Sequence, residues 1–224
     1  MHHHYILNIE TATKNCSVSI AKNGETLLCK QVAELGYSHA EKIHVFIEEI
    51  MQELGLSFTA ISAVAVSQGP GSYTGLRIGV SAAKGLCFAL NIPLIAIDTL
   101  QVLASQLHIT EGVIIPMIDA RRMEVYSAVF NTHLQKIREV QAEVIDENSF
   151  ENFDEPIHFL GDCSEKCQSV LKKENFIFHT SAVYPSANEM GKLSYEKFNT
   201  QDFEDVAYFE PYYLKDFMIT PSKK

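Results

Sequence analysis

The sequence predicts an α/β fold in which helices pack on a mixed β-sheet. Three observations lead to this prediction: short apolar runs typical of buried strands, longer segments with apolar residues at helical spacing, and a glycine-rich loop that joins one strand to one helix. The order expected in the first half is strand, strand, strand, helix, strand, helix, strand. With 224 residues, 46% of them hydrophobic, the chain is long enough for a sizeable core in one large domain or two small ones.

The first half contains the clearer pattern. Strands are expected at residues 5–10, 17–21, 25–32, 61–66 and 94–97. Asn23-Gly24, between the second and third strands, is typical of a tight hairpin turn. The first helix is expected from Ser38, which stands at capping-box spacing from Glu41, to residue 54, just before Gly55. The second helix is expected over residues 76–90, directly after the glycine loop.

The second half is patterned more weakly. Strands are expected at 113–118, 125–130, 137–144 and 157–160, helices at 164–173 and 187–198, and an extended tail at 208–214. Pro211 in this tail suits an edge position. We therefore divide the chain into a lobe 1–104, which carries the glycine loop and both long helices, and a smaller lobe 105–224, whose last segment is expected to pack back on the first lobe.

Charge and composition exclude several classes of protein. The net charge of −10 and the pI near 5.3 argue against a free-standing nucleic-acid binder, because such binding rests on Lys and Arg that neutralise phosphates. Five scattered cysteines form no disulfide framework. There is no secretory signal and no apolar run long enough for a membrane span, so we expect a cytoplasmic protein. The histidines at 2–4 are a tag remnant or native, and we exclude them from any metal site.

The loop QGPGSYTG at 68–75 is the most informative local feature. Its glycines allow close backbone approach, and the following helix N-terminus offers unpaired N–H groups to an anion. The loop is neither a Walker loop nor a GxGxxG motif, and a tight structural turn is the alternative interpretation. The candidate residues for a nucleotide or anion are Glu10, Thr11, Gly69, Gly71 and Ser72.

The helix after the loop is apolar on nearly all sides. Gly75, Gly79 and Ala83 are four residues apart, so they form a flat strip that admits another backbone. One interpretation is a partner surface, and the alternative is that the 38–54 helix covers this face. The candidate interface residues are Gly75, Leu76, Gly79, Val80, Ala83, His39 and Phe46. If the strip binds a partner, Gly79→Leu should block pairing and leave the fold largely intact.

Candidates for acid–base catalysis are few. Glu10, Asp98 and Asp119 each end an expected strand, where a carboxylate is often a helix or turn cap. No Gly-x-Ser-x-Gly elbow and no His-Glu-x-x-His helix is present, so the usual hydrolase signatures are missing. The residues alone therefore predict no catalytic residue and no metal ligand.

Four segments together resemble the TsaB family, also called YeaZ. They are ILNIETAT at 6–13, QGPGSYTGLRIG at 68–79, DARRMEVY at 119–126 and EPYYLK at 210–215, and they span the chain from end to end. The resemblance implies the duplicated actin, sugar-kinase and heat-shock ATPase fold (ribonuclease H-like), with two related lobes of mixed sheets. It also implies a role in making N6-threonylcarbamoyladenosine at position 37 of tRNA. Glu10 stands where many members of the family have Asp.

The same resemblance implies a subunit that lacks its own active site. The catalytic relative TsaD carries a His-x-x-x-His metal motif, and counting forward from residues 91–93 places its two ligand positions at Thr99 and Leu103. Leucine cannot ligate a metal and a lone threonine hydroxyl is a poor ligand, so no such metal site is expected here. We therefore expect a non-catalytic scaffold that binds and activates TsaD.

The resemblance also implies the partners. They are TsaD in a heterodimer, TsaE docked on the pair, a homodimer when the chain is alone, and tRNA only through the complex, with no membrane. No cofactor is expected on the chain alone, which leaves ATP or ADP at the complex interface. Two alternatives stay open: a nucleotide-dependent kinase or ATPase of the same fold, using Glu10 and the glycine loop, and a glycoprotein endopeptidase. Against the kinase, no adenosine-side triple-glycine loop is present in 105–224.

Overall fold

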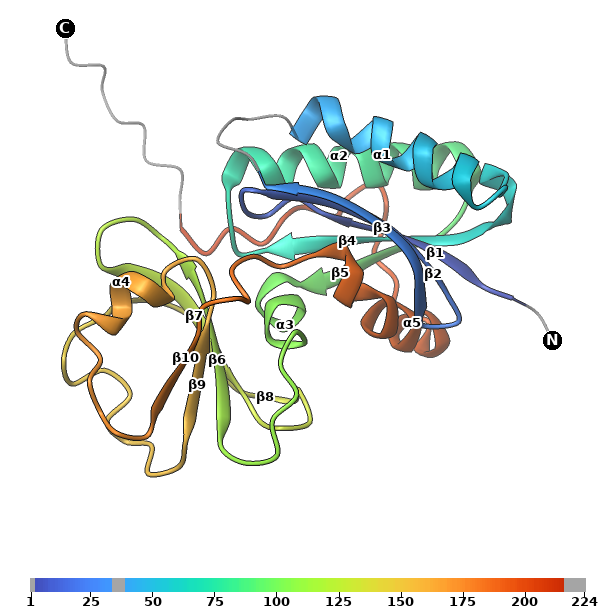
Figure 1. The fold of residues 1–224 in the computed structure, drawn as a ribbon. Helices are drawn as coiled ribbons and strands as arrows, with labels where there is room; N and C mark the ends of the chain where they lie inside the picture. Colours follow the sequence, from blue (N-terminus) through green and yellow to red (C-terminus); the bar gives the residue numbers. More distant parts are fainter. Residues whose placement is uncertain (1–2, 34–38, 216–224) are drawn as a thin grey trace, which may run out of the picture.

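The computed structural model describes residues 3–33 and 39–215, and it folds them into two lobes, each built on a five-stranded sheet (Figure 1). The first sheet has the order β3-β2-β1-β4-β5 and the second has the order β10-β9-β6-β7-β8. Both sheets mix antiparallel pairs with parallel ones. The expected α/β class with mixed sheets is confirmed.

The first lobe is a sheet with helices on both faces. Its elements are β1 (Tyr5–Glu10), β2 (Asn15–Lys22), β3 (Glu25–Ala33), α1 (His39–Glu53), the 3-10 helix η1 (Phe58–Ala60), β4 (Ile61–Gly69), α2 (Tyr73–Leu90), β5 (Leu94–Asp98) and α3 (Thr99–Ala104). In Figure 1, α1 and α2 cover one face of the sheet, while α3 and α5 lie on the other. Asn23 and Gly24 both have positive φ in the β2–β3 turn, as the Asn-Gly signal indicates.

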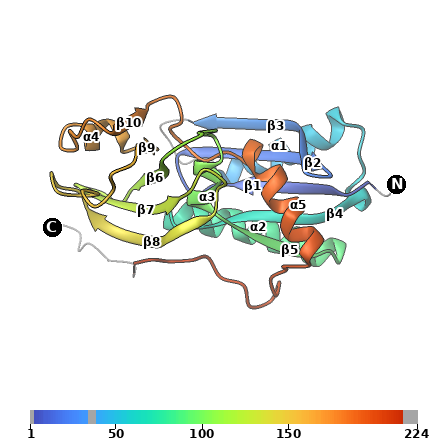
Figure 2. The ribbon, with the colours of Figure 1, turned by 90° about the horizontal axis from the view of Figure 1, so that it is seen from below.

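The second lobe continues from β6. Its elements are β6 (Val113–Asp119), β7 (Glu124–Phe130), β8 (Lys136–Val144), β9 (Ile157–Leu160), α4 (Ser164–Gln168) and β10 (Phe176–His179). The chain then forms η2 (Ala187–Glu189) and α5 (Met190–Thr200), which pack on the first sheet, as Figure 2 shows for α5. Beyond α5 the chain runs along the first lobe, where Glu204 forms a β-bridge with Leu94 and the Tyr212 N–H donates to the Gln68 carbonyl over 2.7 Å, and then Lys215 reaches Glu124 of β7.

Some boundaries differ from the expected ones. The helix α2 begins at Tyr73, three residues before the predicted start, because Ser72 caps it by accepting from the Gly75 N–H. The helix α4 ends at Gln168, so the prediction of a helix to residue 173 is wrong; two 3-10 type bonds, from Ser169 and Val170, end the helical turn. Ser38 lies outside the described residues, so its predicted cap stays a prediction.

The helix α3 packs against both lobes and joins them. Leu100, Leu103 and Ala104 pack against β6 and β7, while Val102 packs against the first sheet. A short helix that is buried at every position except Gln101 thus belongs to both cores, and the carboxyl ends of the first sheet lie beside it. None of the helices within residues 3–33 and 39–215 has the length and apolar character that crossing a bilayer requires.

Candidate functional site

Three parallel strands of the first lobe end together next to α3. Glu10 ends β1, Gly69 ends β4 and Asp98 ends β5, and these strands are neighbours in the sheet. In open α/β sheets, ligands bind outside the carboxyl ends of the strands. This edge is therefore the place where a site of the first lobe is expected.

Glu10 lies fully buried at this edge. Its carboxylate accepts a hydrogen bond from the Ala12 N–H over 2.6 Å and another from the Ser67 hydroxyl. Burial raises the pKa of Glu10 to about 7, and the two hydrogen bonds lower it by less than burial raises it. The side chain thus binds the chain's own backbone and hydroxyl groups and is closed to solvent.

The glycine loop also satisfies its polar groups internally. The Gly69 N–H donates to Thr99 Oγ1 over 3.0 Å, the Ser72 N–H donates to the Ala12 carbonyl over 2.7 Å, and the Thr11 hydroxyl donates to the Gly75 carbonyl over 2.8 Å. A Cβ at position 71 would overlap the Ala12 carbonyl, so glycine is required there for close approach. The residues predicted for an anion do come together, but Glu10, Thr11, Gly69 and Ser72 already bond to neighbouring residues of the same chain, which favours the structural-turn alternative.

The strip of small residues on α2 faces the chain's own sheet. Gly75, Gly79 and Ala83 are buried, and a Cβ at position 79 would overlap the Thr11 hydroxyl while meeting Val66 at 3.5 Å. Leu76 and Val80 are buried on the same side. The strip does permit a close approach, but to β1 and β4 of the same chain. The prediction that these five residues form a partner surface is therefore wrong in its choice of face, and Gly79→Leu would disrupt the fold.

The two predicted interface residues on α1 differ from each other. His39 is buried, and its Nε2 lies 2.8 Å from the Thr13 carbonyl, so it ties the start of α1 to the β1–β2 turn. Phe46 is half-buried and packs against the core of the first lobe. Neither side chain is presented outward as an interface residue would be.

The outward sides of α1 and α2 enclose a shallow groove of about 680 Å³. Its lining residues are Ala40 and His44 on α1 and Tyr73, Thr74, Arg77, Ile78, Ser81, Ala82, Gly85 and Leu86 on α2. Arg77 and Gly85 are exposed, and a Cβ at position 85 would meet no atom within 4 Å. The groove therefore offers an apolar floor with room for side chains from another molecule.

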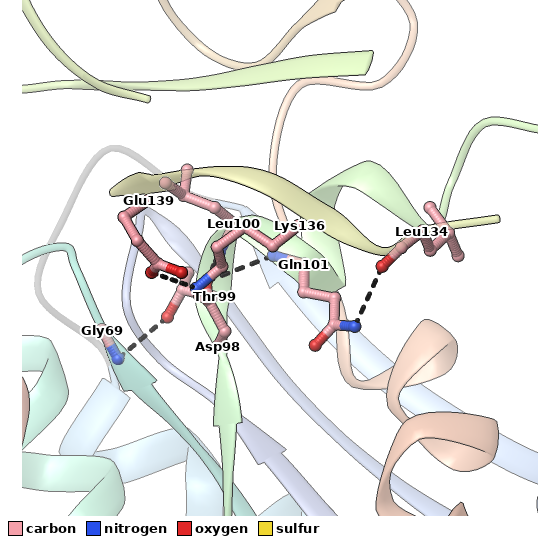
Figure 3. Close-up of polar contacts among 8 residues, drawn as sticks. All are labelled: Gly69, Asp98, Thr99, Leu100, Gln101, Leu134, Lys136 and Glu139. Atoms are coloured by element: carbon pink, nitrogen blue, oxygen red, sulfur yellow. Dashed lines mark hydrogen bonds and ion pairs between the residues drawn. The ribbon is translucent and has the colours of Figure 1, made fainter. Parts of the chain in front are cut away.

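The helix α3 begins with a polar network (Figure 3). Asp98 caps the helix by accepting from the Leu100 N–H over 2.8 Å and the Gln101 N–H over 3.3 Å, and its other oxygen pairs with Lys136 at 2.6 Å. Lys136 belongs to β8, and the Gln101 side chain donates to the Leu134 carbonyl over 3.3 Å, so both contacts join the lobes.

Thr99 and Leu103, both in α3, have structural roles. Thr99 is fully buried and its hydroxyl accepts from the Gly69 N–H, while Leu103 is fully buried in the core that α3 shares with the second sheet. Within residues 3–33 and 39–215, no three His, Cys, Asp or Glu side chains are grouped so that they could hold a metal ion.

Asp119 occupies the matching position of the second lobe. It ends β6, accepts from the Arg121 N–H over 3.0 Å and pairs with Lys166 of α4. Its own N–H donates to Asp162 over 2.8 Å, and burial raises the pKa of Asp162. The sequence reasoning did not select Ser67, Lys136, Asp162 or Lys166. Only Asp162 has a local signal, a carboxylate directly after a strand and a glycine.

Comparison with known proteins gives consistent matches. A family model described as TsaD, tRNA N6-adenosine threonylcarbamoyltransferase, matches residues 34–216. A tRNA threonylcarbamoyladenosine biosynthesis protein TsaB from Bacillus subtilis (strain 168) is 29% identical over 222 residues, which is 94% of this chain and 93% of that protein. A tRNA N6-adenosine threonylcarbamoyltransferase from the same organism is 37% identical over 108 residues, 42% of this chain but only 31% of the transferase.

Solved structures show the same architecture. YeaZ from Pseudomonas aeruginosa superimposes with a TM-score of 0.83 at 22% identity, covering 94% of this chain and 100% of that one. The ethanolamine utilization protein EutJ from Carboxydothermus hydrogenoformans superimposes with a TM-score of 0.54 at 12% identity, covering 85% of this chain and 89% of that one. The expected actin-like, duplicated fold with two lobes is confirmed.

Proposed function

The chain belongs to the TsaB (YeaZ) family, which is related to TsaD, and we propose that it is a non-catalytic subunit of the tRNA N6-threonylcarbamoyladenosine(37) transferase complex that binds and activates TsaD. The resemblance inferred from the four sequence segments is confirmed by these relatives. The finer role proposed here rests on the geometry of α3, the glycine loop and the α1–α2 groove.

The burial of Thr99 and Leu103 is the observation that carries the proposal. These are the positions where the resemblance to TsaD places two metal-binding histidines. In this chain Thr99 holds the glycine loop through a 3.0 Å hydrogen bond, and Leu103 is part of the core between the lobes. Hydroxyl and hydrocarbon at these positions do not suit a catalytic metal, so this chain would contribute structure to the complex and TsaD would contribute the chemistry.

The groove between α1 and α2 supports binding to a partner. Ile78, Ala82 and Leu86 give it an apolar floor, and Arg77 and Ser81 stand exposed beside them. Such a patch on a helix pair suits another helix pair, in a related heterodimer with TsaD or in a homodimer when TsaD is absent. We place TsaE on the TsaB–TsaD pair, ATP or ADP at its interface, and tRNA on the assembled complex.

Reconstitution tests this function. Purified TsaD, TsaE and the enzyme that supplies threonylcarbamoyl-adenylate are assayed for tRNA modification with and without this chain. We expect modification only when the chain is present. Full modification in its absence would refute the activating role.

Nucleotide binding by the isolated chain separates the proposal from the kinase or ATPase alternative. Because Glu10 is closed and the N–H groups of Gly69, Ser72 and Gly75 are already paired, we expect the isolated chain to bind ATP no more tightly than the millimolar range and to release no phosphate. Tight binding with turnover, measured by calorimetry and a phosphate-release assay, would instead support an enzyme of this fold.

A further inference from the structure

The turn between β6 and β7 holds two arginines in the left-handed region of backbone conformation. Arg121 has φ +78° and Arg122 has φ +54°, values that residues other than glycine rarely adopt. Three hydrogen bonds hold the turn: Ala120 N–H to the Glu124 carbonyl at 3.1 Å, Glu124 N–H to the Arg121 carbonyl at 3.1 Å, and Arg121 N–H to Asp119 at 3.0 Å. The two side chains therefore leave the turn from a fixed and unusual backbone.

Both guanidinium groups are exposed and available. In the part of the chain that the structure describes, no hydrogen bond or ion pair reaches the guanidinium of Arg121 or of Arg122. Elsewhere in the second lobe the terminal nitrogens of Arg138 are engaged, since they bond Glu143, at 2.6 Å, and Ser127. The arginines of the turn thus differ from a structural arginine, since within the described residues neither guanidinium has a hydrogen bond or an ion pair.

Two lysines lie beside the turn. Lys166 of α4 donates to the Arg122 carbonyl over 2.6 Å and pairs with Asp119. Lys14, an exposed residue of the β1–β2 turn on the first lobe, lies near enough to Asp162 to act on it electrostatically, as Lys166 does. We call Lys14, Arg121, Arg122 and Lys166 the basic cluster.

The acids near the basic cluster do not neutralise it. Asp119 is paired with Lys166, and Glu124 is paired with Lys215 from the C-terminal segment. Asp162 is turned inward and accepts the Asp119 N–H over 2.8 Å. Three cations, Lys14, Arg121 and Arg122, therefore face solvent without an ion-pair partner among residues 3–33 and 39–215, on a protein whose net charge is −10. A polyanion would be repelled by most of this surface and attracted here.

Arginine is suited to phosphate in particular. Its planar guanidinium binds phosphate oxygens through two parallel hydrogen bonds, and it is always charged. Two adjacent guanidinium groups on a hydrogen-bonded turn, with two lysines nearby, fit the repeated phosphates of a nucleic-acid backbone, which need no base readout.

We infer that the basic cluster contacts the phosphate backbone of the tRNA when the complex binds it. This inference rests on the proposed function, since an acidic chain needs the complex to hold RNA, and it assigns to this subunit a direct contact with the substrate. The contact adds affinity and places the tRNA, while sequence recognition lies elsewhere.

The test uses the assembled complex and a fluorescently labelled tRNA. Arg121→Gly with Arg122→Gly removes both charges and suits the left-handed backbone, so the turn is kept. We expect tRNA affinity at low salt to fall roughly ten-fold, and the slope of log K against log salt to become about 1 to 2 smaller. The charge-preserving variant, Arg121→Lys with Arg122→Lys, should keep most of the tRNA affinity and most of the salt slope of the unchanged chain. Lys192→Ala with Lys197→Ala, which removes two charges on α5 where it packs on the first sheet, should change affinity less than two-fold.

The outcomes separate two failures. If the double-glycine complex assembles, modifies tRNA and shows unchanged affinity and salt slope, the basic cluster does not contact tRNA, while the activating role stands. If the variant instead loses TsaD or TsaE with its tRNA slope unchanged, the cluster binds an acidic protein and the inference is wrong. If the unchanged chain fails to stimulate modification at all, the proposed function fails and the inference fails with it.

Discussion

The two lobes repeat one topology and differ in what covers it. In each lobe the first strand pairs antiparallel with the second and parallel with the fourth. Each first strand ends in a carboxylate, Glu10 or Asp119, that accepts the N–H of the residue two positions later. Each fourth strand leads to a glycine of nearly the same φ, +117° at Gly69 and +116° at Gly161.

The differences begin after these shared features. The first lobe continues into an 18-residue helix that buries Glu10 and its loop, whereas the second continues into a 5-residue helix that leaves Asp119 exposed. The comparison teaches that a strand-end carboxylate and a glycine loop are part of the repeated fold. By themselves these features are no evidence of a ligand. The elements packed around the carboxylate decide whether it is open to a ligand.

The largest effect on the free energy of unfolding is expected at Gly69 and Gly161, the glycines that occur at the same point in both lobes. A Cβ at Gly161 would overlap the Met117 carbonyl inside the second sheet, whereas a Cβ at Gly69 would lie 2.6 Å from the Tyr212 carbonyl on the C-terminal segment. We expect Gly161→Ala to lower the free energy of unfolding by more than about 3 kcal/mol, and Gly69→Ala by less, because a segment near the chain end shifts more easily than a strand. Urea denaturation measures both. An equal or larger loss for Gly69→Ala would contradict this reading of the repeat.

The pH dependence of stability should separate the two strand-end carboxylates. Burial raises the pKa of Glu10 from 4.5 to about 7, so the folded state holds a proton that the unfolded state has lost. Stability should therefore fall as pH rises from about 4.5 to about 7 and stay level above, by about 3 kcal/mol in all. Glu10→Gln should remove this contribution from the difference curve against the unchanged chain.

Asp119→Asn is the matched control for Glu10→Gln. Asp119 is exposed and paired with Lys166, so its replacement should leave the fall between pH 4.5 and 7 in place. If stability still falls over this pH range in Glu10→Gln, or no longer falls in Asp119→Asn, then Glu10 is not the group responsible.

The contacts of Asp98, which link the two lobes, should contribute less to the free energy of unfolding. Asp98→Ala removes the cap of α3 and the 2.6 Å pair with Lys136 on the second lobe, and we expect a loss of about 2 kcal/mol. Asp98→Ser keeps a capping oxygen and loses only the pair, so about half of the loss should return. Thermal or urea unfolding measures both variants. Equal losses for Ala and Ser would show that the cap contributes nothing.

The smallest effect on stability is expected at Gly85. A Cβ there meets no atom within 4 Å and the groove beside it is open, so Gly85→Trp should leave the free energy of unfolding within about 0.5 kcal/mol, yet fill the α1–α2 groove. We expect it to prevent association with TsaD in sedimentation velocity. Lys192→Trp on α5, an exposed helix position outside the groove, serves as the control and should associate normally.

Much of the fold was predictable because its signals are local. Alternating and apolar runs predicted nine of the ten strands found in residues 3–33 and 39–215, and Asn23-Gly24 predicted the hairpin turn. The helix α3 was missed because Thr99–Ala104 is short and buried at all positions but Gln101, which leaves no periodicity to recognise. The strand β10 was missed because four residues give too little alternation.

The site was less predictable because it depends on which face of a helix is covered. Glycine spacing on α2 predicted a close approach correctly, but only the packing of Gly79 on Thr11 shows that the approach is internal. Lys136 and Lys166 reach their carboxylates across 38 and 47 residues of sequence, and no local pattern indicates such pairs. The outward groove follows from the same packing, since the buried side of α2 fixes the exposed one.

The most direct test of the central claim compares two variants in the reconstituted transferase reaction. One is Gly85→Trp, which fills the outward groove, and the other is Glu10→Gln, which alters the closed strand-end site. If the chain acts as a partner subunit, Gly85→Trp abolishes the stimulation of tRNA modification and Glu10→Gln retains it. Loss of stimulation by Glu10→Gln with normal stimulation by Gly85→Trp would contradict the account, because the chain would then act through its own site.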